Sequence, residues 1–89
     1  MKRTDGFLLK KINQVPYLLP VGQRIAEQRR GMKLNETGEQ IWNLIPSAEN
    51  RNELLALLAD YYEIPLENKD MLEKDMDSFL DQLAAWGML

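Results

Sequence analysis

The sequence contains no cysteine and no histidine. This excludes a disulfide framework, a thiolate nucleophile, the commonest zinc ligands and the commonest general base. The only serines, Ser47 and Ser78, have no histidine to activate them. Gly22 and Gly31 fit no phosphate-binding loop. We therefore expect no catalytic site, no cofactor and no metal ion, so the chain is predicted not to be an enzyme.

Long apolar runs are also lacking. No stretch approaches the ~20 apolar residues of a membrane span. The first residues, Met1-Lys2-Arg3, are followed by Asp5 and Gly6, whereas a signal peptide needs an apolar run of ~7–15 residues. We therefore expect a cytoplasmic protein without a membrane partner.

The 89 residues are enough for one domain with a modest core, and we expect it to span 1–89. The net charge of −3 is unevenly spread along the chain. Residues 1–45 carry eight Lys/Arg against four Asp/Glu, and residues 46–89 carry three against ten. The acidic second half argues against nucleic-acid contacts by the helices expected there.

The first third of the chain has the pattern of short strands. The apolar segment 7–12 is followed by Asn13-Gln14, a plausible turn, and then by a second strand at 17–21. Pro20 donates no ladder hydrogen bond, so this strand should lie at an edge, or end or bulge there. Residues 23–30 fit either a helical turn or a hairpin arm. Residues 32–34 form a third strand, with Lys33 as the kind of outward charge that guards a sheet edge.

Three helices are predicted in the remainder. Asn35 is a good N-cap for a helix to about residue 45 that buries Ile41, Trp42, Leu44 and Ile45. The second helix covers about 52–62 and has Leu54, Leu58 and Tyr61 on one stripe, and the third follows the spacing of Leu72, Met76, Phe79, Leu80 and Leu83. Gly87 is a candidate C-cap of the third helix. The order predicts an α+β fold, a three-stranded antiparallel sheet followed by three α-helices.

Three features could carry a function. Asp75, Asp77 and Asp81 form a carboxylate cluster, which we interpret as a solvated helix face. Three helices beside a small sheet can also form a winged helix-turn-helix that binds DNA, with Arg24, Arg29, Arg30 and Lys33 on phosphates, but the third helix is acidic. The open sheet edge could accept a partner peptide as an added strand.

A pattern of residues along the chain resembles the pyrroloquinoline quinone biosynthesis protein D (PqqD) family. It comprises Tyr17-Leu18-Leu19-Pro20-Val21-Gly22, then Gly31-Met32-Lys33-Leu34-Asn35-Glu36-Thr37-Gly38 with Ile41-Trp42, and later Glu53-Leu54-Leu55, Leu58, Tyr61-Tyr62, Asp75, Phe79-Leu80, Leu83 and Gly87-Met88-Leu89. The resemblance covers nearly the whole chain. It implies a winged helix-turn-helix-like domain of three strands and three helices that recognises ribosomally made precursor peptides.

The resemblance also implies a site and partners. A leader peptide would be held as an added strand against the third strand, in a groove closed by the third helix, and presented to a modifying enzyme, often a radical S-adenosylmethionine (radical SAM) protein. On this sequence the implied peptide-binding residues are Arg30, Gly31, Met32, Lys33 and Leu34 on the strand and Asp75, Ser78, Phe79 and Gln82 on the helix. Two roles stay open for Asp75, pairing with a basic leader residue or simple solvation at the surface, and Phe79 is expected in the core rather than the groove. Structural roles are expected for Leu34, Asn35, Thr37, Gly38 and Trp42.

Two other hypotheses stay open on the sequence. One is the winged-helix DNA-binding regulator, whose affinity would fall steeply with salt. The other is a structural self-association domain, such as a homodimer formed by edge pairing or strand exchange. The sequence names neither the precursor peptide nor the partner enzyme.

Overall fold

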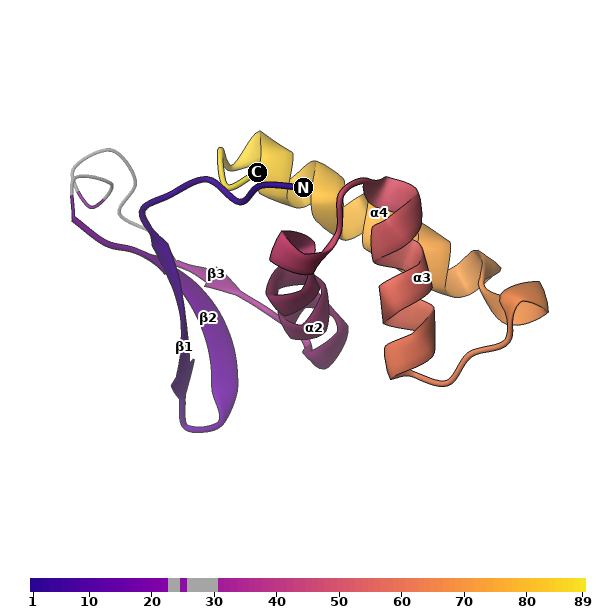
Figure 1. The fold of residues 1–89 in the computed structure, drawn as a ribbon. Helices are drawn as coiled ribbons and strands as arrows, with labels where there is room; N and C mark the ends of the chain where they lie inside the picture. Colours follow the sequence, from indigo (N-terminus) through magenta and orange to yellow (C-terminus); the bar gives the residue numbers. More distant parts are fainter. Residues whose placement is uncertain (23–24, 26–30) are drawn as a thin grey trace.

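A computed structural model describes residues 1–22, 25 and 31–89 of the chain. Strands β1 (Phe7–Ile12), β2 (Val15–Pro20) and β3 (Met32–Lys33) are followed by helices α2 (Glu36–Leu44), α3 (Arg51–Tyr61) and α4 (Asp70–Ala85). The short 3₁₀ turns η1 (Ile45–Ser47) and η2 (Leu66–Asn68) follow α2 and α3. The sheet lies at one side of the molecule and the helices gather at the other (Figure 1). The predicted α+β fold is confirmed.

The sheet is antiparallel, in the order β1-β2-β3. Asn13 and Gln14 form the predicted turn between β1 and β2, both with positive φ (51° and 68°). This is the backbone of a type I′ hairpin turn, whose twist matches that of the flanking strands. The second strand begins two residues earlier than predicted and ends at Pro20, one of the outcomes expected for that residue. Residues 23–24 and 26–30 lie outside the described part of the chain.

Sequence signals define the helix ends. The side chain of Asn35 accepts a hydrogen bond from the N–H of Gly38 at 2.7 Å, which confirms it as the N-cap of α2. At the end of α4, the N–H of Met88 donates to Leu83 at 2.8 Å and Gly87 has a φ of 73°. This pattern is a Schellman motif with glycine in the left-handed position, as predicted for Gly87. Helix α2 ends at Leu44, close to the predicted end at about residue 45, and Pro46 lies in the 3₁₀ turn η1 that follows.

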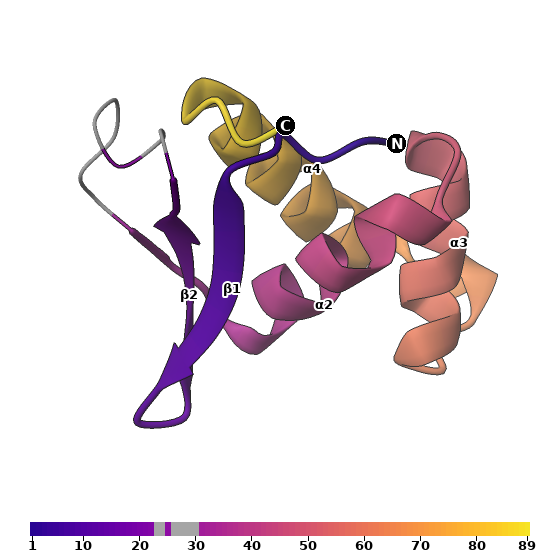
Figure 2. The same cartoon turned by 60° about the vertical axis from the view of Figure 1, so that its left-hand side comes forward.

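The core lies between the inner face of the sheet and the three helices. Its fully buried side chains are Leu18, Ile41, Ile45, Leu54, Leu58, Met76, Leu83 and Met88. Figure 2 shows α2 beside the sheet and α4 running behind it. The N-terminal segment is fastened to the other end of the chain, because the N–H of Thr4 donates to Met88 at 3.0 Å. No helix in the described ranges is long and apolar enough to cross a membrane.

One predicted core position is wrong. Tyr61 was placed on the buried stripe of the second helix, but its exposed fraction is 52%. The buried stripe advances in steps of four, from Leu54 to Leu58 to the partly buried Tyr62. Tyr61 instead packs against the ring of Tyr62 in an edge-to-face arrangement with centroids 5.0 Å apart.

Candidate functional site

A groove of about 260 Å³ lies between β3, the beginning of α2 and one side of α4. Its lining consists of Lys33, Leu34, Asn35, Thr37, Gly38, Ile41, Asp75, Ser78, Phe79 and Gln82. Residues that are far apart in the sequence thus form one surface, with a strand on one side and a helix on the other. Lys33 and Asp75 are the two charged residues in this lining.

The pairing of β3 with β2 directs the backbone N–H and C=O of Lys33 toward the open edge of the sheet. The N–H of Leu34 donates to the carbonyl oxygen of Pro16 at 2.9 Å, and Lys33 lies opposite Tyr17. Hydrogen-bonded and non-hydrogen-bonded pairs alternate along an antiparallel ladder, so the N–H and C=O of Lys33 point away from β2. Within the described residues β3 is an edge strand with β2 as its neighbour. An extended segment could therefore add to this edge through main-chain hydrogen bonds.

Two prolines limit the length of β3. The N–H of Val21 donates to Gly6 at 2.8 Å, and this register directs the backbone groups of Pro16, Leu18 and Pro20 toward β3. Proline has no N–H, so Pro16 and Pro20 can only accept hydrogen bonds from β3, whereas Leu18 can both donate and accept. The two-residue length of β3 follows from this, and the chain then turns into α2.

Helix α4 forms the opposite side of the groove. Its buried face consists of Leu72, Met76, Leu80 and Leu83. A second stripe, with the spacing i, i+3, i+4, i+7, lines the groove and consists of Asp75, Ser78, Phe79 and Gln82. Phe79 is half-buried and the other three side chains are exposed. This side of α4 therefore offers an aromatic ring, a carboxylate, a hydroxyl and an amide.

The first turn of α2 contacts the Phe79 ring. A Cβ atom added to Gly38 would lie 3.2 Å from Cε1 of Phe79 and 3.1 Å from Oδ1 of Asn35. Glycine at this position therefore allows the ring to lie directly against the helix. The apolar part of the groove is built from Phe79 together with Leu34 and Ile41, which are almost completely buried.

The structure brings together six of the nine predicted peptide-binding residues: Lys33, Leu34, Asp75, Ser78, Phe79 and Gln82. Met32 is buried with 2% exposure and faces the core. Gly31 precedes β3 and packs against β2, since an added Cβ would lie 2.5 Å from Cδ2 of Leu19. Arg30 lies outside the described residues.

Some assignments change with the structure. Phe79 was expected in the core rather than the groove, but it contacts the core and also lines the groove. Asn35, Thr37 and Gly38 were given structural roles, yet they line the groove as well. Ile41 was predicted as a core residue and not as part of the site. The strand-to-helix junction at 34–38 was the available signal, because a helix that begins directly after an edge strand must border any groove beside that strand.

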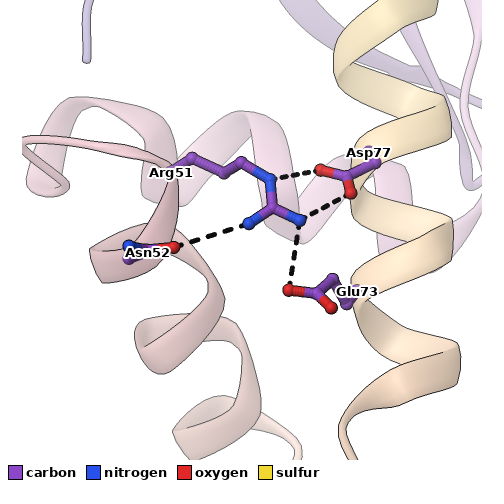
Figure 3. Close-up of polar contacts among 4 residues, drawn as sticks. All are labelled: Arg51, Asn52, Glu73 and Asp77. Carbon is purple, nitrogen blue, oxygen red and sulfur yellow. Dashed lines mark hydrogen bonds and ion pairs between the residues drawn. The ribbon is translucent and has the colours of Figure 1, made fainter.

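The predicted carboxylate cluster separates in the structure. Arg51 donates hydrogen bonds from Nε and Nη2 to the two carboxylate oxygens of Asp77, at 2.6 and 2.5 Å, and its Nη2 lies 3.1 Å from Glu73 (Figure 3). The hydrogen bonds from Arg51 hold the pKa of Asp77 below its ordinary value. This ion-pair group joins α3 to α4, and none of its residues lines the groove. Asp75 remains on the groove side.

The comparisons with known proteins concern the family and the fold of the chain. The model of the family described as coenzyme PQQ synthesis protein D (PqqD) matches residues 23–89. The chain therefore belongs to the PqqD family. A similar fold occurs in the structure of TbiB1 in complex with the TbiA(beta) leader peptide, with a TM-score of 0.71 and 24% sequence identity over 100% of this chain and 94% of that chain. No curated protein matches the chain.

Proposed function

We propose that this protein is a non-catalytic adaptor that binds the leader segment of a ribosomally synthesised precursor peptide and presents it to a modifying enzyme, for which a radical SAM protein is the leading candidate. The observation that carries the proposal is the outward-facing backbone of Lys33 beside a groove closed by α4. Membership of the PqqD family supports it. A leader peptide in the complex of TbiB1, which has the same fold, supports it further.

In the proposed complex the leader adds as a fourth strand along β3. Its main chain bonds to the N–H and C=O of Lys33, which supplies affinity that does not depend on sequence. Successive side chains of a strand point to opposite faces, so alternate leader residues enter the groove. Apolar ones contact Phe79 and Leu34, and a basic one at the helix side pairs with Asp75.

Catalysis is assigned to the partner enzyme. The sequence has no histidine or cysteine, and no group of three His, Cys, Asp or Glu residues in the described part of the chain could hold a metal ion. The groove offers backbone hydrogen bonds, an aromatic ring and polar side chains, which suit holding and positioning an extended segment.

The test is a titration of isotope-labelled protein with synthetic leader peptides, taken from short precursor genes encoded beside its own. Amide shifts should saturate and centre on Gly31–Leu34 and on the groove side of α4. Lys33→Pro removes the outward N–H and is compared with Lys33→Ala, which removes the side chain alone. Loss of this hydrogen bond leaves its acceptor on the leader unpaired, which should cost about 1–3 kcal/mol, or about 5- to 160-fold in affinity.

A matched control exists on the other edge of the sheet. The pair Lys11–Pro16 is also non-hydrogen-bonded, so the N–H of Lys11 faces outward from β1. Lys11→Pro should leave peptide affinity unchanged, because β1 is the edge away from the groove. If no leader shifts the β3 and α4 amides, or if Lys33→Pro binds as tightly as Lys33→Ala, strand addition at β3 is refuted.

A further inference from the structure

A row of three side chains crosses the outer face of the sheet. Lys10 on β1 lies opposite Tyr17 on β2, and Tyr17 lies opposite Lys33 on β3. These three side chains stand on the face away from the core, since Leu18 and Met32, which point the other way, are buried. Both lysines are exposed. Neither forms an ion pair with another described residue, in contrast to Lys11, which lies 3.4 Å from Glu39 on the inner side.

The rest of this outer face is apolar. Leu8 lies opposite Leu19, and Ile12 lies opposite Val15, on the two sides of the Lys10–Tyr17–Lys33 row. Leu8 and Ile12 are 55% and 47% exposed. The row is therefore a basic strip on an otherwise apolar surface, and its Lys33 end stops at the edge where the proposed leader adds.

An added strand would lengthen this row by one residue. Because the N–H and C=O of Lys33 point outward, the leader residue that bonds to them would be directly opposite Lys33. Its side chain would share the outer face with the Lys33 side chain, while the residues on either side of it would point into the groove. Directly opposed side chains have Cβ atoms about 4.5–5.5 Å apart, and opposite charges in such pairs stabilise the pairing.

Resting on the proposed function, we infer that Lys33 is a specificity-determining residue, which selects leaders carrying an acidic residue opposite it on the outer face, between apolar residues that enter the groove. The row already places Tyr17 beside Lys33 on the β2 side, so an incoming acidic residue would lie on the open side of Lys33, directly opposite its charge. A basic residue at that position would meet Lys33 directly and be disfavoured.

The competing explanation is that Lys33 only guards the edge against strand pairing with other chains. The two roles differ in what they affect. A guard lysine, once neutralised, increases self-association and leaves leader selection unchanged. A selecting lysine changes the preferred charge of the bound peptide.

The experiment uses a display library of short random peptides. Binders are selected separately against the wild-type chain, the Lys33→Glu variant and the Lys10→Glu variant. Peptides that still bind Lys33→Pro are discarded, because they do not use the β3 edge. Lys10→Glu is the matched control: it makes the same charge change in the same row, but it lies about 14 Å from the added strand at ~4.8 Å per strand, beyond the Debye length of about 8–10 Å.

The wild type and Lys10→Glu should enrich Asp or Glu at one fixed position flanked by apolar residues, and Lys33→Glu should enrich Lys or Arg there. For one selected acidic peptide, Lys33→Gln should weaken binding about two- to fivefold, with the difference shrinking at high salt. Peptides that bind with no charge preference, or with the same preference on Lys33→Glu, overturn the inference and leave the adaptor function standing. If no peptide is enriched on the β3 edge, the adaptor function and the inference both fall.

Discussion

The substitution Gly38→Ala should change the free energy of unfolding in two opposite ways, and the structure indicates the size of each change. Gly38 is the third residue of α2, and replacing a helical glycine by alanine gains about 0.5–1 kcal/mol. The new Cβ would lie 3.2 Å from Cε1 of Phe79 and 3.1 Å from the capping oxygen of Asn35. Both neighbours must move by a few tenths of an ångström, and overpacking of this kind costs about 1–3 kcal/mol. We therefore expect Gly38→Ala to lower the free energy of unfolding, by at most about 2.5 kcal/mol.

The contribution of the Phe79 ring can be separated by a double-mutant cycle. In a Phe79→Leu background Cε1 is absent, so Gly38→Ala should cost less or become stabilising, with a coupling of at least about 0.5 kcal/mol. The free energies of unfolding come from urea denaturation of the four proteins, and the aromatic NMR signals of Phe79 report whether the ring moves. If Gly38→Ala changes the free energy of unfolding equally with and without the Phe79 ring, the ring does not lie against α2. Our description of the apolar part of the groove would then be incorrect.

Two further predictions concern the helices. The hydroxyl of Tyr62 is buried without a partner in the described part of the chain, so Tyr62→Phe should raise the free energy of unfolding by about 1 kcal/mol and the melting temperature by about 4–8 °C; Tyr61→Phe, on an exposed ring, should change neither, and a destabilised Tyr62→Phe would contradict this. Because Arg51 lowers the pKa of Asp77 in the fold, the stability from this pair is present above the ordinary Asp pKa of 3.8 and is lost as the pH falls below it. Asp77→Asn should therefore be less stable than the wild type at neutral pH and equal to it in strong acid, as followed by thermal melts, and Asp81→Asn is the control; a difference that persists in acid would refute the assignment.

The sequence predicted those elements whose signals are local. Asn13-Gln14, the Asn35 cap and Gly87 each act through the backbone within a few residues, and all three appear where expected. The spacing of Leu72, Met76, Leu80 and Leu83 likewise predicted the buried face of α4. These features need no knowledge of the partner on which the element packs.

Features that depend on neighbouring elements could not be predicted in the same way. Arg51 and Asp77 are joined because α3 and α4 pack side by side, and no local pattern links two residues so far apart in the sequence. The exposure of Tyr61 depends on which of two adjacent tyrosines continues the stripe of Leu54 and Leu58. Phe79 has the spacing of a core residue, and its second role appears once the first turn of α2 lies against its ring.

The two prolines of β2 connect sequence to the proposed function most directly. A central strand usually excludes proline because its N–H groups bond on both sides. Here the N–H groups of Val15, Tyr17 and Leu19 serve β1, while Pro16 and Pro20 occupy positions that would serve β3. The backbone groups of the β1–β2 hairpin are thus paired with each other. Strand β3 is joined to β2 by the pairing of Met32 with Leu18 and by the hydrogen bond from the N–H of Leu34 to Pro16. A β3 strand held this weakly by β2 has the most to gain from pairing on its other side, so leader binding should order β3 more than any other strand.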